Sequence, residues 1–186
     1  MISEQTLTLG VSAPTETPVQ YLTFALRDEV FAMDIRRVRE IIQYSSMTAV
    51  PQMPEFVRGV INLRGAVVPV IDLSARFGGK QTEVARRTCI VIVEISQTID
   101  GVDIHQDIGV VVDSVNEVLE IPSSEIEPPP AFGARIRSDF ISGMGKVAGH
   151  FVIILNINLI LSIEEMATLA STVDSEDGSA VTDSPA

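Results

Sequence analysis

The sequence of 186 residues has no Trp, one Cys and two His, and only 13 Lys and Arg against 25 Asp and Glu. A single cysteine excludes an intrachain disulfide framework, and the apolar run around Cys89 predicts a buried, unreactive thiol. The shortage of basic residues argues against a nucleic-acid binder, which needs clustered Lys and Arg to release phosphate counterions. With no Trp and two Tyr, the chain also lacks the aromatic surface on which single strands stack.

Long apolar runs are missing as well. Charge or Gly interrupts each run well before the roughly 20 residues that a membrane-spanning helix requires. Residues 1–19 lack the basic cluster and the apolar stretch of a signal peptide. We therefore expect no direct membrane insertion and a cytoplasmic location.

Patterns that carry catalysis or hold a cofactor are equally scarce. His105 and His150 do not cluster with each other or with Cys89 at metal-ligand spacing, so no metal is expected. The glycines fall in strand turns instead of a phosphate-binding loop that opens a helix, and no Ser lies in a nucleophile elbow. These absences predict a protein without cofactor or catalytic activity, which leaves an interaction module.

What the chain does have is an uneven distribution of charge. Residues 20–88 contain ten basic and seven acidic residues, whereas residues 89–170 contain three basic and twelve acidic residues. Regions of opposite sign favour docking of different partners on different faces, because complementary potentials steer encounter and set register. The alternative is that acidic loops serve only solubility.

Short β-strand patterns dominate the first half. Leu22, Phe24 and Leu26 alternate with other residues, as in a half-buried strand. Asp34 is a plausible cap for one helical turn, and Asp72 or Ser74 for another. These patterns predict strands separated by one-turn helices.

A hairpin is indicated by two apolar runs, residues 59–63 and 66–73, that flank Arg64 and Gly65. Pro69 lies inside the second run, which places that strand at a sheet edge or a bulge, because Pro donates no ladder hydrogen bond. An Arg at a hairpin tip either presents its five-donor fork to a partner or is a solvated turn residue.

In the second half, residues 89–95 and 108–112 read as strands, and residues 99–107 as a polar loop. Near the C-terminus, Ser162 and Glu165 form a capping box, followed by an apolar helix face at Ile163, Met166, Leu169 and Ala170. The whole pattern predicts an all-β chain with short helices, built as one or two small barrels. The expected organisation is a mobile tail (1–19), one domain (20–170) and a disordered acidic tail (171–186). Within the domain, one lobe falls mainly in residues 20–88 and the other mainly in 89–160, with exchange of strands between them left open.

Several segments together resemble one family. They are Val38-x-Glu40-Ile41-Ile42, the long block from Pro51 through Gly59-Val60-Ile61-Asn62-Leu63-Arg64-Gly65 to Leu73, residues 109–115, residues 141–145 and residues 153–157. In this combination the chain, from about residue 20 to 169, resembles the CheW family of chemotaxis coupling proteins.

The resemblance implies two SH3-like five-stranded β-barrels packed together, with a C-terminal helix. It implies a non-catalytic signal-transduction adaptor, recruited to membrane receptor arrays, that couples methyl-accepting chemoreceptor tips to the regulatory domain of the histidine kinase CheA. Other CheW copies are a further candidate partner. The chain has no room for the receiver domain of a CheV-type protein.

By motif position, the resemblance also implies a receptor-binding surface. An Arg64–Glu40 salt bridge would cross a groove, and apolar members of residues 110–115 would line it. The resemblance assigns no kinase-binding residue. The implied receptor-binding residues are Val38, Glu40, Asn62, Arg64, Gly65, Val110, Val112 and Val115.

Two alternatives remain at this point. One is a coupling protein of a related pathway with non-flagellar output, such as surface motility or a second messenger. The other is a small β-barrel that binds a ligand. Residues 97–106 form a longer and more acidic connection than the family fold needs, and with the acidic C-terminal tail they either set partner choice or are passive.

Overall fold

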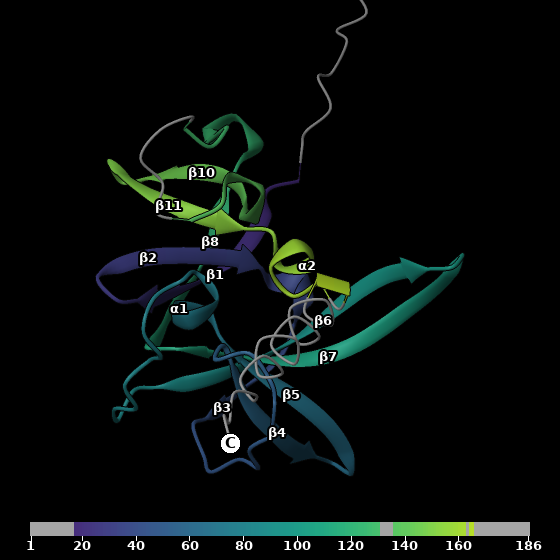
Figure 1. Cartoon of the computed structure of the whole chain (residues 1–186). Helices are drawn as coiled ribbons and strands as arrows, with labels where there is room; N and C mark the ends of the chain where they lie inside the picture. Colours follow the sequence, from purple (N-terminus) through teal and green to yellow (C-terminus); the bar gives the residue numbers. More distant parts are fainter. Residues whose placement is uncertain (1–16, 131–135, 163, 166–186) are drawn as a thin grey trace, which may run out of the picture.

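The computed structural model describes residues 17–130, 136–162 and 164–165, which form two β-sheets joined by short helices (Figure 1). Sheet A has the strand order β8-β1-β2-β11-β10-β9, and sheet B the order β3-β6-β7-β5-β4. Each sheet curls into a barrel-like half, which confirms the expected all-β, two-barrel fold.

The strands of sheet A are β1 (Val19–Leu26), β2 (Glu29–Asp34), β8 (Ser114–Ile121), β9 (Ile126–Glu127), β10 (Ile141–Val147) and β11 (His150–Leu155). Those of sheet B are β3 (Val38–Gln43), β4 (Val57–Leu63), β5 (Ala66–Asp72), β6 (Cys89–Ile99) and β7 (Val102–Val112).

The helices are all short. They are α1 (Leu73–Arg76), α2 (Ile157–Ile160) and the 3-10 turns η1 (Ile35–Arg37), η2 (Ser123–Glu125) and η3 (Ser138–Phe140). Within the described ranges, no helix is long and apolar enough to cross a membrane. The expected tails and most of the expected C-terminal helix lie outside the described residues. Its start is visible, because the Glu165 amide donates to Ser162 Oγ at 3.4 Å, as a capping box requires.

The two sheets do not divide the chain near residue 88. Sheet B is built from residues 38–112, whereas sheet A combines β1 and β2 with strands that follow residue 113. Sheet A therefore takes strands from both halves of the chain. Parallel pairing of β11 with β2, in the middle of sheet A, joins the strands β8, β1 and β2 to the strands β11, β10 and β9. Local sequence patterns do not encode such distant pairings, because they set which face a strand buries and not which strand lies beside it.

The first half of β6 and the last five residues of β7 are buried on both faces. Ile90, Ile92 and Val111 point into the interior of sheet B, whereas Val91 and Val93 point into a core shared by the two sheets. All five side chains are fully buried. This two-sided burial explains why residues 89–95 form a continuous apolar run and not an alternating one.

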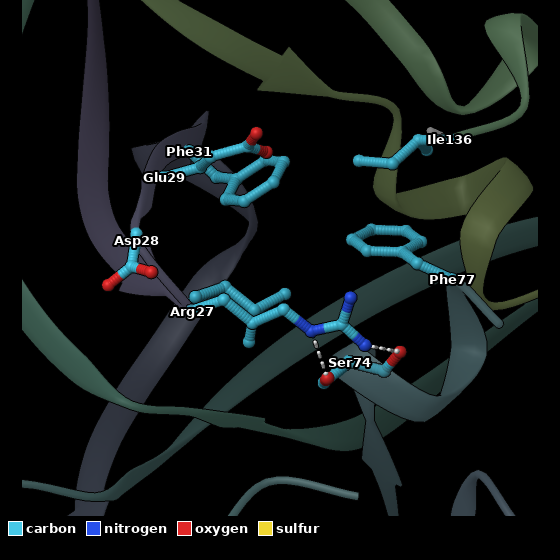
Figure 2. Close-up of a pocket in the computed structure, with 8 residues that line it drawn as sticks. Arg27, Asp28, Glu29, Phe31, Ser74, Phe77 and Ile136 are labelled. Carbon is cyan, nitrogen blue, oxygen red and sulfur yellow. Dashed lines mark hydrogen bonds between the residues drawn. The ribbon is translucent and has the colours of Figure 1, made fainter. Parts of the chain in front are cut away.

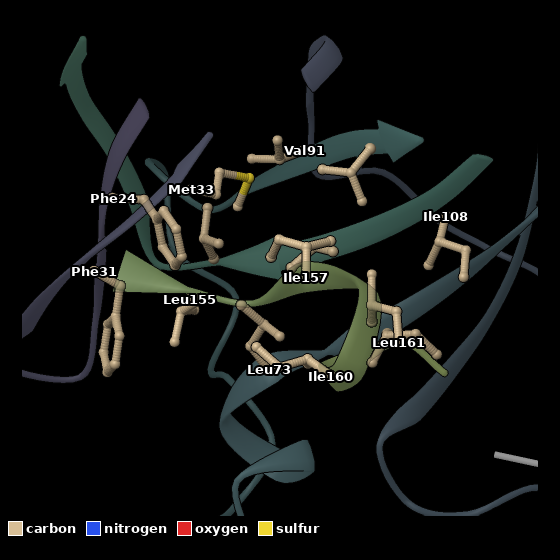
Figure 3. Packing of buried hydrophobic residues seen from close by; sticks show 14 of the residues in the cluster. Phe24, Phe31, Met33, Leu73, Val91, Ile108, Leu155, Ile157, Ile160 and Leu161 are labelled. Carbon is tan, nitrogen blue, oxygen red and sulfur yellow. The ribbon is translucent and has the colours of Figure 1, made fainter. Parts of the chain in front are cut away.

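The shared core holds the two halves together (Figure 3). Phe24 and Phe31 from sheet A and Val91 and Ile108 from sheet B all belong to this core, and α2 adds Ile157 and Ile160 to it. The alternation of Leu22, Phe24 and Leu26 expected from the sequence is confirmed, because all three enter this core. Burial of each such side chain contributes about 1.5–3 kcal/mol, so this core dominates the stability of the assembly of sheets.

Asp72 caps α1, as expected, and has a second role. Its carboxylate accepts hydrogen bonds from the Ala75 amide (3.1 Å), the Thr82 amide (2.8 Å) and Arg58 Nε (2.9 Å). A fully buried carboxylate needs such partners, because an uncompensated charge is costly in a low-dielectric interior. Asp72 thereby ties the connection between α1 and β6 to the end of β5.

Arg27 fastens the β1–β2 turn of sheet A to α1, at the end of sheet B (Figure 2). Its Nε donates to Ser74 Oγ at 2.9 Å and its Nη2 to the Ser74 carbonyl at 3.4 Å. The guanidinium passes across Gly79, where a Cβ atom would lie only 1.0 Å from Nη2. The small pocket in Figure 2 is lined also by Phe31 and Phe77. The Arg27–Ser74 contact crosses this pocket and connects the β1–β2 turn with α1.

Two local expectations were wrong. Residues 99–107, expected as a polar loop, continue the β6–β7 hairpin up to the pair Ile99↔Val102. Asp100 and Gly101, both at positive φ (51° and 78°), make the two-residue turn, and Asp-Gly is a strong hairpin signal that the charged composition obscured. Pro69 is not on an edge strand, because β5 lies between β4 and β7. Pairing of β5 with β7 begins only at Val70, immediately after the proline.

We predict that Gly59→Ala is much more destabilising than Gly79→Ala. At Gly59, φ is 147° and a Cβ atom would lie 2.3 Å from the Thr48 carbonyl oxygen, so rigid backbone must move. At Gly79 only the flexible end of Arg27 must move. Urea denaturation should show that the free energy of unfolding falls by more than about 2 kcal/mol for Gly59→Ala and by about 1 kcal/mol for Gly79→Ala. Equal losses would contradict this account of the two glycines.

Candidate functional site

The surface around Arg64 lies where sheet B closes on itself. Strands β3 and β4 are the two ends of this sheet, and the curl of the sheet brings them together. A bridge joins β4 to the connection that follows β3, in which Thr48 and Val60 exchange backbone hydrogen bonds of 2.8 and 3.0 Å. We call the line along which β4 and its hairpin tip face β3 and this connection the seam.

An ion pair crosses the seam from the tip of the β4–β5 hairpin to β3. Arg64 Nη1 lies 2.9 Å from Glu40 Oε1, and Arg64 Nη2 lies 3.0 Å from Glu40 Oε2. The two contacts make a bidentate pair, which fixes the plane of the guanidinium. The salt bridge expected from the sequence is therefore present. Because the Arg64 side chain is 77% exposed, the pair contributes at most about 1 kcal/mol to stability.

The hairpin turn holds Arg64 in a strained conformation. Arg64 (φ 53°) and Gly65 (φ 85°) are the two central residues between the paired Leu63 and Ala66. Turns with two positive φ angles favour Asn, Asp and Gly, so Arg at the first position is not explained by turn preference. Asn62 supports the turn, because its Oδ1 accepts a hydrogen bond from the Gly65 amide at 2.9 Å. The structure thus brings Glu40, Asn62, Arg64 and Gly65 together.

The entrance to β3 is set by η1 and its cap. Asp34 Oδ1 accepts from the Arg36 amide at 2.9 Å, and the carboxylate also pairs with the Arg36 guanidinium, with Nη2 2.5 Å from Oδ2. The side-chain hydrogen bonds from Arg36, assisted by its charge, lower the pKa of Asp34 although partial burial opposes the shift. The capped turn delivers the chain directly to Val38, the first residue of β3.

The four valines implied by the resemblance differ in how far they are exposed to solvent. Val38 on β3 and Val115 on β8 are half-buried at the margin of the shared core, so each keeps part of its side chain at the surface. Val110 and Val112 are 0% exposed inside that core. The expectation that these two line a binding groove is corrected here, because the last five residues of β7 are covered on both faces and Val110 and Val112 serve packing. Val115 belongs to sheet A and the seam to sheet B, so the remaining residues span both sheets.

The described part of the chain contains no group of three His, Cys, Asp or Glu side chains placed to hold a metal ion. His105 Nδ1 lies 3.1 Å from Ser96 Oγ, and His150 begins β11 in the other sheet. Cys89 is half-buried, with its Sγ 3.2 Å from the Arg87 carbonyl oxygen.

Comparison with known proteins gives a consistent picture. A family model described as "CheW-like domain" matches residues 20–165. The chain is 31% identical over 156 residues to the chemotaxis protein CheW of Klebsiella aerogenes, covering 84% of this chain and 89% of that one. It is 32% identical over 146 residues to CheW of Helicobacter pylori, covering 78% and 83%. The crystal structure of the scaffolding protein TtCheW from Thermoanaerobacter tengcongensis superposes with a TM-score of 0.68 and 36% identity, covering 79% of this chain and 90% of that one.

We predict a pH-dependent contribution of Asp34 to stability. Asp34→Ala should lower the free energy of unfolding by about 1 kcal/mol at neutral pH, because both cap and charge are lost. The carboxylate contribution is complete above the ordinary Asp pKa of about 3.9 and is lost as the pH falls through the lower pKa of the folded state. Denaturation between pH 7 and pH 3 should show the difference from the parent protein shrinking. Asp34→Asn, which keeps a cap acceptor, is the matched control and should cost less; a constant difference across the range would contradict the assignment.

Proposed function

The chain belongs to the CheW family, and from this premise we propose that it is the adaptor that couples methyl-accepting chemoreceptors to the histidine kinase CheA. Its role is geometric: it holds receptor tip and kinase regulatory domain in a fixed relation without performing chemistry itself. We propose that it acts in the cytoplasm, where receptor arrays recruit it. The similarity to chemotaxis proteins of other bacteria favours this role over the ligand-binding alternative.

The observation that supports the proposal best is the Arg64–Glu40 pair on the seam. The Arg64 side chain is exposed, held in a defined plane and mounted on a turn whose backbone does not require Arg. A rigid guanidinium with unused donors suits recognition of carboxylates or backbone carbonyls on a partner helix. We propose that the receptor surface comprises Val38, Glu40, Asn62, Arg64, Gly65 and Val115.

This surface draws on both sheets, since Val115 lies on β8 and the seam in sheet B. The receptor would therefore contact both barrel halves at once, and we infer that residues 20–170 act as one domain. The exposed remainder of both sheets is left for the kinase and for further CheW copies. No kinase-binding residue is proposed.

The proposal is tested by Arg64→Glu in a reconstituted assembly. The purified chain is combined with a chemoreceptor cytoplasmic domain and CheA, and both ternary-complex formation and kinase control are measured. Charge reversal should reduce receptor capture about tenfold or more, because an attractive contact becomes repulsive. Thermal unfolding should change little, since an exposed ion pair contributes no more than about 1 kcal/mol.

Two variants sharpen this test. Arg86→Glu makes the same charge change at an exposed position outside the seam and should leave coupling intact. The double variant Arg64→Glu with Glu40→Arg restores an ion pair with reversed polarity, so it should remain uncoupled if the receptor reads Arg64 directly. A normal ternary complex and normal kinase control with Arg64→Glu alone would refute the proposed surface.

A further inference from the structure

The β6–β7 hairpin extends beyond the body of sheet B. Its two strands have eleven residues each, and their register continues to Ile99↔Val102. Pairing of β3 with β6 stops at Val93, and pairing of β5 with β7 starts at Gly109. Residues 94–108 therefore form a two-stranded ribbon that projects to one side of the molecule (Figure 1). We call this segment the ribbon.

The two edges of the ribbon differ. On the β6 side, α2 covers the backbone, because the Ser96 amide donates to Asn158 Oδ1 at 3.4 Å. On the β7 side, no strand in the described parts of the chain pairs with residues 102–108. Pro69 accounts for this, because a residue without an N–H ends the run of β5 along β7 at Val70. The ribbon thus offers one open strand edge.

The open edge carries alternating chemistry. One face presents Val102 and Ile104, which are 62% and 37% exposed. The opposite face presents Asp103, His105 and Asp107. Exposed apolar side chains on an unpaired edge are unusual, because native proteins usually protect such edges with charge, twist or a covering element.

The negative charge on the second face is only partly balanced. Asp107 lies opposite Glu94, a like-charge pair that would be unfavourable alone. Arg39 joins them, in contact with Glu94 and with its Nε 3.9 Å from Asp107 Oδ1. Asp103 accepts a hydrogen bond from Thr98 Oγ1 at 2.6 Å. Because a hydroxyl is neutral, this contact does not balance the negative charge of Asp103.

We propose that the outer edge of β7, residues 102–108, binds an extended segment of a partner protein in which Lys or Arg alternates with apolar residues. Such a segment would add a strand to the ribbon. Its basic residues would face Asp103 and Asp107, and its apolar residues would cover Val102 and Ile104. Main-chain hydrogen bonds supply affinity, and the alternating side chains supply register. This binding edge is separate from the seam and does not depend on the function proposed above.

A second copy of the chain fits this edge less well. Antiparallel pairing of two β7 edges about His105 would place Asp103 of each copy opposite Asp107 of the other, and like charges directly opposite are destabilising. The acidic face therefore disfavours self-association in this register, whereas it complements a basic partner.

The probe is a blocked synthetic octapeptide of alternating Lys and Val, titrated into the full chain labelled with ¹⁵N at low salt. The largest amide shifts should fall on residues 102–108, and affinity should decrease as NaCl is raised. A peptide with Glu in place of Lys is the control and should not bind. Absence of shifts with the Lys peptide at millimolar concentration would overturn the proposal, as would shifts centred on any other surface.

Variants test the two chemistries separately. Asp103→Lys should weaken Lys-peptide binding about fivefold, and Asp103→Asn, which keeps an acceptor for Thr98, about twofold. Glu117→Lys makes the same charge reversal at an exposed position of β8 and should leave the affinity for the Lys peptide unchanged. If Glu117→Lys weakened binding as much as Asp103→Lys does, the peptide would be held only by non-specific charge attraction, and the proposal would be overturned. Ile104→Ser should also weaken binding. Sedimentation that shows a dimer abolished by Ile104→Ser would assign the edge to a second copy instead.

Discussion

The first half of β6 and the last five residues of β7 are shielded from water on both faces, and the other elements are placed by what must cover those faces. The interior of sheet B covers one face through residues such as Ile61 and Val68, while sheet A and α2 cover the other. Neither half could expose the shared core without leaving many apolar side chains in water, at about 25 cal/mol for each Å². The two barrels are therefore one packing unit, as the proposed receptor surface on both sheets requires.

Stability and the proposed receptor recognition rest on different residues. Buried valines such as Val110 and Val112 hold the fold, whereas the seam depends on an exposed ion pair, one bridge and a two-residue turn that contribute little energy. Arg64 can change without loss of the core, and the core can be repacked without altering Arg64. For an adaptor this separation is useful, because partner choice can vary while the relative position of the two halves is kept.

Much of the local structure could be predicted from the sequence, because it rests on short-range chemistry. The alternation of Leu22 and Phe24 follows from side-chain period, and the caps at Asp34 and Asp72 follow from capping preference. The hairpin turn was indicated by Gly65 and the two flanking apolar runs, although Arg64 itself is not explained by φ preference. The partition of strands between sheets could not, since Phe31 meets Ile153 across more than half of the chain. Val110 and Val112 were misplaced for the same reason: a motif fixes their position in the chain but not the layer that covers β7. At the site, the Arg64–Glu40 pair could be anticipated only through resemblance to a family.

In the sequence, all strands of sheet B lie between the first two and the last four strands of sheet A, and this order affects folding. All strands of sheet B lie within residues 38–112, so this sheet can form as soon as that segment is available. Strands β1 and β2 are made first but must wait for β8 and β11, which follow more than 80 residues later. Closing such a long loop costs entropy before any contact repays it, which slows folding. During synthesis the N-terminal hairpin, with Phe24 and Phe31 uncovered, would be the part of the nascent chain most dependent on protection from aggregation.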